Sequence, residues 1–185
     1  MHRNKLLKLV NSHHPTDSQE ILFSEQITSF INENLHCFER TLLIGHVTGS
    51  AWILDKSQQF TLLTHHRKLD KWFQTGGHCE GDSDVLNVAL KEAQEETGLS
   101  DIQIISSKIF DIDIHEIPEN KGVPAHLHYD VRFLFEADMN EPLTISSEST
   151  DLAWVALSEV SKLNDSESIM RMVRKVNKII YRQCF

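Results

Sequence analysis

The sequence lacks any long apolar run, and it is also poor in cysteine and in positive charge. No stretch approaches the roughly 18 consecutive apolar residues that mark a membrane-spanning helix. The N-terminal stretch MHRNKLLKLVNSHHP holds only a short apolar segment, which Lys8 interrupts, and this is too polar for a signal peptide. We therefore expect no membrane partner and no export.

Cysteine is too scarce and too irregularly placed for a disulfide framework. Cys37, Cys79 and Cys184 form an odd set without the spacing of a paired scaffold. Free thiols in a reducing cytoplasm are the simpler interpretation, and we expect a cytoplasmic protein.

Positive charge is outnumbered, with 18 Lys and Arg against 27 Asp and Glu, a net charge of −9. An acidic protein repels the phosphates of nucleic acids and of anionic membranes, so we expect no nucleic-acid partner. A phosphorylated small molecule remains a possible ligand where a cation mediates the contact.

The chain of 185 residues is long enough for one globular domain with a sizeable core. Residues 1–35 have the pattern of helices, and Thr16 and Asp17 precede Gln19 and Glu20 with the spacing of a capping box. The apolar residues of one predicted helical face are Ile21, Leu22, Ile27, Phe30 and Ile31. We expect residues 1–35 to form a helical extension packed on a main domain of residues 36–185. The extension either braces a sheet or provides a homodimer contact.

Short β-rich runs follow from residue 40 to 64, and two later segments alternate apolar and polar residues with period two. These are residues 110–115 and 127–135. A last strand near LAWVAL precedes a helix with an apolar stripe. The stripe contains Ile169, Met172, Val173, Val176 and Ile180. Strands on both sides of a central helix predict an α/β fold with a mixed β-sheet.

The central helix follows a Gly-rich loop, ends before Gly98, and carries an unusual acidic face. Glu92, Glu95 and Glu96 stand at positions i, i+3 and i+4, which places three carboxylates side by side. Like charges at this spacing, near the negative end of the helix dipole, destabilise a helix. Lys91 relieves only Glu95. The face is either simply solvated, as charge runs on helices usually are, or it holds a divalent cation.

The stretch Gly77–Leu99, GHCEGDSDVLNVALKEAQEETGL, resembles the Nudix box. The three helix glutamates and Gly98 match the box in register. Ser83 and Lys91 depart from it, because a Glu and an Arg stand there in the family. Asp82 or Asp84 can supply a carboxylate one position away from Ser83.

This resemblance implies a Nudix-type α/β/α sandwich and a hydrolase that cleaves a diphosphate bond in a nucleoside diphosphate linked to another moiety. It implies that Mg²⁺ or Mn²⁺ is bound by Gly77, Glu92, Glu95 and Glu96. The expected catalytic residues are Glu95 and Glu96 and a general base, for which Glu148, in the loop before the last strand, is the candidate. An ordinary surface glutamate is the alternative for Glu148.

Histidines are concentrated in the middle of the chain. Six of them are His65, His66, His78, His115, His126 and His128. His128 shares a strand face with Asp130 and Arg132, and this face has three interpretations. It is a solvated strand face, or a substrate pocket, or a transition-metal site of histidines with Cys79, for which no established ligand spacing is present.

In the pocket interpretation, Arg132 binds a phosphate or carboxylate, and a histidine or Tyr129 stacks on a base. His78, His126 and His128 complete this set of expected substrate-binding residues. Two functions besides a hydrolase stay open: a non-catalytic nucleotide-sensing domain, which the departures at Ser83 and Lys91 favour, and an isomerase of the isopentenyl-diphosphate type. The intact helix glutamates argue against both.

Overall fold

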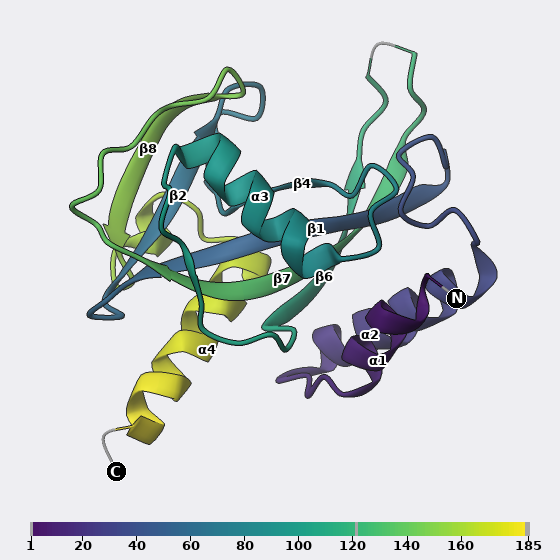
Figure 1. The fold of residues 1–185 in the computed structure, drawn as a ribbon, viewed down its shortest axis with the longest axis horizontal. Coiled ribbons are helices and arrows are strands. Elements are labelled where there is room, and N and C mark those ends of the chain that lie inside the picture. Colours follow the sequence, from purple (N-terminus) through teal and green to yellow (C-terminus); the bar gives the residue numbers. More distant parts are fainter. Residues whose placement is uncertain (1, 121, 184–185) are drawn as a thin grey trace. The chain divides into compact units, whose positions relative to one another are not determined.

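A computed structural model describes residues 2–120 and 122–183 of the chain. The helices and strands are shown in Figure 1. In chain order they are α1 (Asn4–Asn11), α2 (Ser18–Glu33), β1 (Gly45–Asp55), β2 (Phe60–His66), β3 (Lys71–Phe73), β4 (Thr75–His78), α3 (Val85–Thr97), β5 (Gln103–Ile104), β6 (Asp111–Ile117), β7 (His126–Ala137), β8 (Ser149–Ala156), the 3₁₀ helix η1 (Val160–Lys162) and α4 (Glu167–Gln183). This mixture of helices and strands confirms the predicted α/β class.

The chain forms two compact units. The first unit comprises the described residues of Met1–Ser50, Gly76–Leu90 and Ser106–Phe133. The second comprises those of Ala51–Thr75, Lys91–Ile105 and Leu134–Phe185. Three elements, β1, α3 and β7, begin in the first unit and continue into the second.

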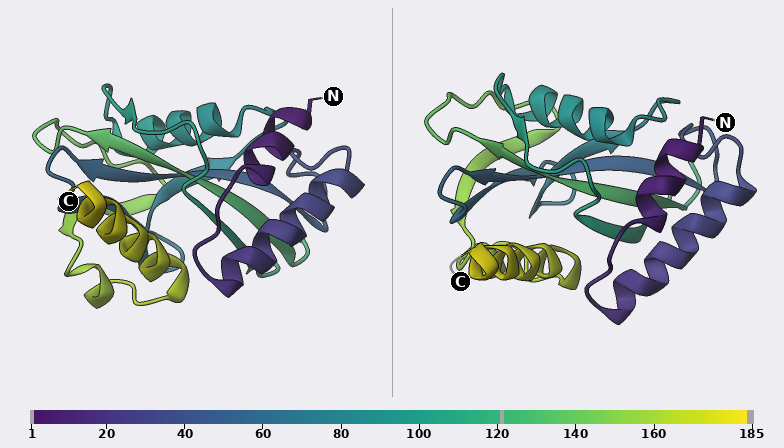
Figure 2. Two further views of the ribbon diagram at one scale, coloured as in Figure 1. Left: turned by 90° about the horizontal axis from the view of Figure 1, so that it is seen from below. Right: turned by 60° about the horizontal axis from the view of Figure 1, so that its bottom comes forward.

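The first unit begins with the predicted helices, which lie side by side (Figure 2). The carboxylate of Asp17 caps α2 by accepting the backbone N–H of Glu20 at 2.9 Å, and the Thr16 N–H donates back to the Glu20 carboxylate at 2.7 Å. The Asp17 bond satisfies one of the backbone donors that the first turn of a helix leaves without partners, so the predicted cap at the start of this helix is confirmed. The return bond differs from that of a capping box, because Glu20 binds the N–H of Thr16, one residue before the cap.

The predicted apolar face of α2 is wrong in its first turn. Ile27 and Ile31 are buried, but Ile21 and Leu22 remain 50% and 45% exposed. The inward position of that turn belongs to Glu20, which is fully buried. Since each residue turns the helix by about 100°, Ile21 and Leu22 point away from the buried side.

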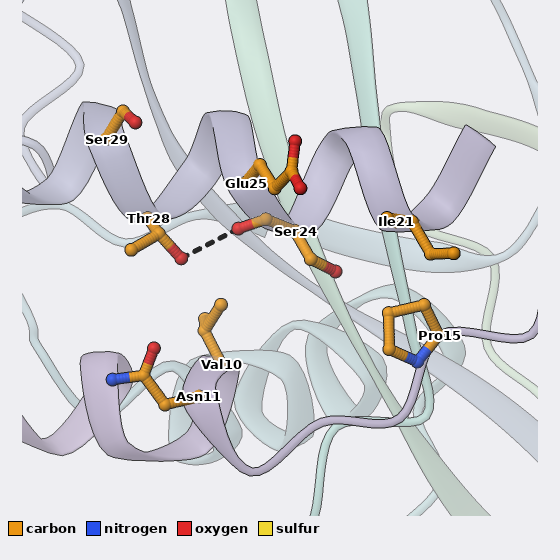
Figure 3. A pocket seen from close by; sticks show the side chains of 8 residues that line it. All are labelled: Val10, Asn11, Pro15, Ile21, Ser24, Glu25, Thr28 and Ser29. Carbon is orange, nitrogen blue, oxygen red and sulfur yellow. Dashed lines mark hydrogen bonds between the residues drawn. The ribbon is translucent and has the colours of Figure 1, made fainter. Parts of the chain in front are cut away.

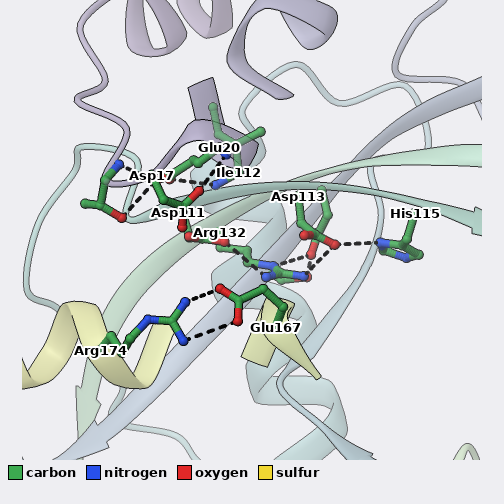
Figure 4. A network of polar contacts seen from close by, with 12 residues as sticks. Asp17, Glu20, Asp111, Ile112, Asp113, His115, Arg132, Glu167 and Arg174 are labelled. Carbon is green, nitrogen blue, oxygen red and sulfur yellow. Dashed lines mark hydrogen bonds and ion pairs between the residues drawn. The ribbon is translucent and has the colours of Figure 1, made fainter. Parts of the chain in front are cut away.

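Buried Glu20 joins the helices to β6 of the same unit (Figure 4). One carboxylate oxygen lies 2.7 Å from Nε2 of His13 and accepts the Ile112 N–H at 3.3 Å. Nδ1 of His13 lies 3.2 Å from the Ile109 carbonyl. Helix α2 therefore packs on β6.

The β6–β7 ladder of the first unit is antiparallel, and it pairs Asp111 with Arg132, Asp113 with Asp130, and His115 with His128. The alternation of polar residues is as predicted, but the solvated interpretation of this face is wrong. Asp111, Asp130 and Arg132 are at most 2% exposed. Charged residues are almost never buried to this extent unless they are paired, so this face has internal partners.

The second unit is built on β2, which pairs with β8 from Phe60↔Ala156 to His66↔Ser149. β2 also pairs with β3 and with the end of β1, and β5 pairs with the end of β7. The stripe predicted for the last helix is confirmed in α4, because four of its residues are buried and Ile180 is half-buried. The four buried residues are Ile169, Met172, Val173 and Val176.

Asp55 organises the turn between β1 and β2. Its buried carboxylate accepts the backbone N–H groups of Ser57, Gln59 and Phe60 at 2.8 to 2.9 Å. Burial raises the pKa of this carboxyl, but the hydrogen bonds from Ser57, Phe60 and Gln59 outweigh burial, so the net effect holds the pKa below its ordinary 3.8. The ionised form is therefore favoured by folding.

We expect Asp55→Asn to lower the free energy of unfolding by about 1–3 kcal/mol at neutral pH, because turn N–H groups lose a charged acceptor. A depressed pKa contributes stability above the unfolded-state pKa, and this stability is lost as pH falls through the folded-state value. The difference between variant and parent should therefore shrink in acid. Urea unfolding from pH 7 to pH 3 measures it, with exposed Asp165→Asn as the control. An equal difference at every pH would contradict the assignment.

The remaining sequence expectations concern thiols and membrane spans. Cys37 and Cys79 are buried and form no disulfide, as predicted, and Cys184 lies outside the described residues. Burial raises the pKa of the Cys37 thiol to about 11, although Arg3 opposes the shift, so the thiol stays protonated at neutral pH. None of the described helices is long and apolar enough to cross a bilayer.

Candidate functional site

Helix α3 carries the acidic face and is delimited by two local structures. At its start, the Asp82 carboxylate accepts the Asp84 N–H at 2.8 Å, and the Val88 N–H donates to the Asp84 carbonyl at 3.0 Å. At its end, Gly98 has a φ of +74°, which only glycine adopts readily, and its N–H donates to the Gln94 carbonyl. The predicted helix stop at Gly98 is confirmed.

The glutamates of α3 are more accessible than two of the residues next to them. Ala93 and Thr97 are fully buried, while Glu95 is exposed and Glu92 and Glu96 are half-buried. All three are oxygen donors on one helix face, and hard cations such as Mg²⁺ prefer such donors. The donor set therefore fits the divalent cation that the sequence implies. Gly77, the fourth expected ligand, lies in β4 of the first unit.

The two departures from the box have identifiable surroundings. Ser83 is half-buried between Asp82, which accepts the backbone bond described above, and Asp84, which pairs with Lys5 at 2.6 Å. Lys91 lies 3.5 Å from Glu95, with both side chains at least 60% exposed. An exposed pair of this kind contributes at most about 1 kcal/mol. Lys91 thus offsets one charge of the acidic face only weakly.

Glu148 is exposed in the turn before β8, in the second unit. Arg67 holds this turn from both sides. Its Nε donates to the Ser147 carbonyl at 3.1 Å, its Nη2 donates to the Ser149 carbonyl at 2.7 Å, and its backbone N–H donates to the Glu148 carbonyl at 3.0 Å. The backbone of Glu148 is fixed, while its carboxylate remains accessible to solvent.

The first unit gathers histidines from separate strands. His46 at the start of β1, His78 at the end of β4 and His128 in β7 place ligand atoms within 4.8 Å of one another. Among the described residues, this is the one group of potential ligand atoms that meets so closely. His126 lies beside it, 5.0 Å from His46 between ring centroids. The predicted residues His78, His126 and His128 are therefore neighbours.

Sequence reasoning missed His46, which is only 2% exposed. The available signal was a single histidine inside an apolar strand, where a buried polar ring needs a partner. In the described part of the chain, neither ring nitrogen of His46 has a hydrogen-bond partner, and Nε2 of His128 has none either. A buried polar group left without a partner costs about 1–3 kcal/mol.

Both of these imidazoles are neutral at neutral pH. Burial, followed by the charge of His78, lowers the pKa of His46 to about 4. Burial, followed by His78 and His115, lowers the pKa of His128 to about 2. His46 and His128 therefore present uncharged nitrogen atoms.

Arg132 is the centre of a buried ionic network (Figure 4). Its Nε lies 2.7 Å from Asp130, Nη1 lies 3.1 Å from Asp111, and Nη2 lies 3.3 Å from Asp113. Burial alone lowers the pKa of this guanidinium, but the three carboxylates outweigh burial and raise it. Asp130 also accepts the hydroxyls of Thr48 and Ser50 at 3.0 and 2.7 Å.

Two of the expected substrate contacts are thus engaged within the fold. All three guanidinium nitrogens of Arg132 face carboxylates, and Tyr129 stacks on Phe30 of α2 with ring centroids 3.8 Å apart. Phe30 is buried. The roles of Arg132 and Tyr129 in substrate binding stay predictions, and the contacts that both residues make in the structure are with other side chains of the protein.

The first unit also has a surface hollow between α1 and α2 (Figure 3). It is lined by Val10, Asn11, Pro15, Ile21, Ser24, Glu25, Thr28 and Ser29. This lining has one carboxylate and no cationic side chain, so it has no group suited to a phosphate.

Known proteins resemble this chain in sequence and in fold. The asymmetrical bis(5'-nucleosyl)-tetraphosphatase of Rattus norvegicus is 25% identical over 123 residues, which are 66% of this chain and 80% of the rat protein. The binary complex of the C. elegans Ap4A hydrolase has a TM-score of 0.60 at 18% identity and covers 73% of this chain and 97% of its own. The E. coli dihydroneopterin triphosphate pyrophosphohydrolase has a TM-score of 0.54 at 15% identity, covering 70% and 92%.

The Nudix hydrolase RenU of M. smegmatis has a TM-score of 0.53 at 16% identity and covers 75% of this chain and 88% of its own. These likenesses confirm the predicted Nudix-type fold. A family model described as the NUDIX domain matches residues 46–176, which is more than half of the chain and includes all of α3. The chain therefore belongs to the NUDIX family and is a Nudix-type pyrophosphohydrolase.

Proposed function

We propose that this enzyme cleaves, with the help of a divalent metal ion, a diphosphate bond in a nucleoside diphosphate that is linked to another moiety. The observation that carries the proposal is one face of α3, where three glutamates, one exposed and two half-buried, lie in the register of the Nudix box. Three adjacent like charges destabilise a helix end, and a bound cation removes that cost. Broken local rules of this kind are expected at functional sites.

The rat relative is named for a dinucleoside tetraphosphate, and the C. elegans neighbour for Ap4A. Dinucleoside polyphosphates are therefore the first substrates to test. Such molecules are strongly anionic, and this chain carries a net charge of −9, so the substrate needs compensating positive charge at the site.

In this proposal Glu92, Glu95 and Glu96 would hold Mg²⁺ or Mn²⁺, which would supply positive charge for the phosphate oxygens and a more acidic water. Water attacks one phosphorus atom in line, the bond from that phosphorus to the leaving oxygen breaks, and Glu148 accepts the proton of the water. Gly77 as a further ligand, and His78, His126 and His128 as substrate contacts, remain predictions from the sequence.

We expect Glu148→Gln to lower kcat by about 10²- to 10⁴-fold with little change in KM, because an amide cannot accept the proton. The turn should keep its structure in this variant, because Arg67 binds its backbone and Gln occupies the same space as Glu. Steady-state rates at saturating Mn²⁺ measure the effect. Glu119→Gln, the same change in another exposed loop, is the matched control, and an unaltered kcat in Glu148→Gln removes this residue from the mechanism.

The proposed reaction is tested by incubating the protein with Mg²⁺ or Mn²⁺ and a panel of substrates. The panel contains dinucleoside polyphosphates, ADP-ribose, nucleotide sugars, coenzyme A, oxidised dNTPs and isopentenyl diphosphate. Release of a nucleoside phosphate by cleavage at a diphosphate bond supports the proposal. Binding without turnover identifies a sensing domain instead, and migration of a double bond identifies an isomerase.

A further inference from the structure

We propose that His46, His78 and His128 form a second metal site, which binds a borderline divalent transition metal such as Zn²⁺ and is distinct from the glutamates of α3. The three side chains come from β1, β4 and β7 within the first unit, and their ligand atoms lie within 4.8 Å of one another. This inference does not depend on the proposed hydrolysis.

The arrangement of the rings suits a shared ligand. Ring centroids lie 5.0 Å apart for His46 and His78, 4.8 Å for His46 and His128, and 5.1 Å for His78 and His128. In a tetrahedral zinc site, metal–nitrogen bonds of about 2.0–2.1 Å separate neighbouring nitrogens by roughly 3.3 Å. Small rotations of three side chains close the remaining distance.

Burial provides a second and independent observation. His46 is 2% exposed, and neither of its ring nitrogens has a hydrogen-bond partner in the described chain. Nε2 of half-buried His128 is itself buried and also has no hydrogen-bond partner there. Most buried polar atoms have hydrogen-bond partners. Because the nitrogens of His46 and His128 lie close together and have none, we infer that a ligand binds between them. Neutral imidazole is the form that binds a metal, and metal binding favours that form.

The backbone brings His46 to this position through Gly45. Its φ is +150°, and a Cβ there would lie 2.6 Å from the Leu127 carbonyl oxygen. The Leu127 N–H also donates to the carbonyl of Ile44. The start of β1 can therefore approach β7 closely only because residue 45 is glycine, and the next residue, His46, meets His128.

Two more histidines border the site and are oriented by their own partners. Nδ1 of His126 lies 2.8 Å from the Pro124 carbonyl, and Nδ1 of His115 lies 3.3 Å from Asp113, which also contacts Arg132. Metal-binding histidines commonly have such a carbonyl or carboxylate behind the ring. The site thus has three buried or half-buried ligands and a coordination position left for water or a substrate atom, as catalytic zinc sites have.

The donor chemistry separates this site from that of α3. Imidazole nitrogen suits zinc, iron, nickel and copper, whereas carboxylates suit magnesium and manganese. Cys79 follows His78 directly, but its sulfur is not part of the group of converging atoms in the described structure.

The test is titration of the metal-free full-length protein with Co²⁺ alone, followed by visible absorption. We expect a d–d band that saturates at one equivalent and is displaced by Zn²⁺ but not by excess Mg²⁺. His46→Gln and His128→Gln should each weaken binding at least about 10- to 100-fold. Exposed His36→Gln is the matched control and should bind as the parent does. Unchanged cobalt affinity in both cluster variants would overturn the proposal.

X-ray absorption of the Zn²⁺-loaded parent protein decides the case without any variant. We expect the spectrum to show several imidazoles bound to zinc. A shell of oxygen atoms without imidazole scattering would contradict the site. Because this measurement uses only the parent protein, it remains decisive if His46→Gln fails to fold. Glu96→Gln separates the two proposals, because it should lose turnover and keep the cobalt band. Loss of both at once would show that a single site binds all the metal.

Discussion

Glu96→Gln should lower kcat by at least about 10²-fold while leaving the fold at least as stable as that of the parent. Loss of one ligand charge removes metal-centred stabilisation of the transition state, and such losses commonly have this size. The same change removes one of three like charges from the end of α3, which by itself stabilises a helix by a few tenths of a kcal/mol. Activity and stability should therefore move in opposite directions.

A lower kcat together with unchanged or higher stability would show that Glu96 acts in catalysis and is not needed for folding. Initial rates at saturating substrate and Mn²⁺, together with urea unfolding in metal-free buffer, measure the two quantities on one preparation. Glu25→Gln makes the same chemical change at an exposed position of α2 and should leave both unaltered. A Glu96→Gln enzyme with the parent rate would exclude Glu96 from the mechanism.

Local features of the fold were predictable from the sequence because short-range physics determines them. The cap at Asp17, the helix stop at Gly98 and the buried stripe of α4 depend on neighbours within a few residues along the chain. The glutamate face of α3 is likewise a matter of helical periodicity. The α/β/α fold was predicted from the resemblance to the Nudix box, because this motif of a loop and a helix is typical of that fold.

What the sequence could not give were contacts between residues far apart in the chain. The polar face of β6 and β7 has the period of a solvated strand, and only the three-dimensional pairing of Arg132 with three aspartates explains its burial. His46 lies 32 and 82 positions from His78 and His128, so spacing alone does not reveal the cluster. Ile21 and Leu22 were misplaced because a buried glutamate took the inward position.

The two sets of acidic residues in this chain are compensated differently. Asp111, Asp113 and Asp130 surround a buried guanidinium and accept further hydrogen bonds, so the fold itself provides their counter-charge. On α3, the charge of Glu95 is offset only weakly, by an exposed contact with Lys91. This contrast predicts that substitutions in the first set affect folding, whereas those in the second affect turnover.

Arg132→Met should lower the free energy of unfolding by about 3–5 kcal/mol at neutral pH, because it leaves three buried carboxylates without their cation. Arg132→Lys keeps the charge but not the planar fork that reaches three partners, so a smaller loss is expected. Urea unfolding measures both variants. Arg174→Met is the matched control, because it breaks an exposed ion pair with Glu167 and should cost no more than about 1 kcal/mol.

The same variants test whether Arg132 binds substrate, as the sequence alone indicated. If its main role is to neutralise the carboxylates, Arg132→Lys should lose stability while KM for the substrate stays within about threefold of the parent, since uniform binding energy is unaffected. The opposite pattern, an unchanged unfolding midpoint with KM raised more than about tenfold, would mean that the guanidinium leaves its aspartates to bind phosphate. Moving the Arg132 guanidinium to a phosphate would break its interactions with three buried carboxylates and form only one new contact. We therefore expect the free energy of unfolding to change, and KM to stay nearly constant.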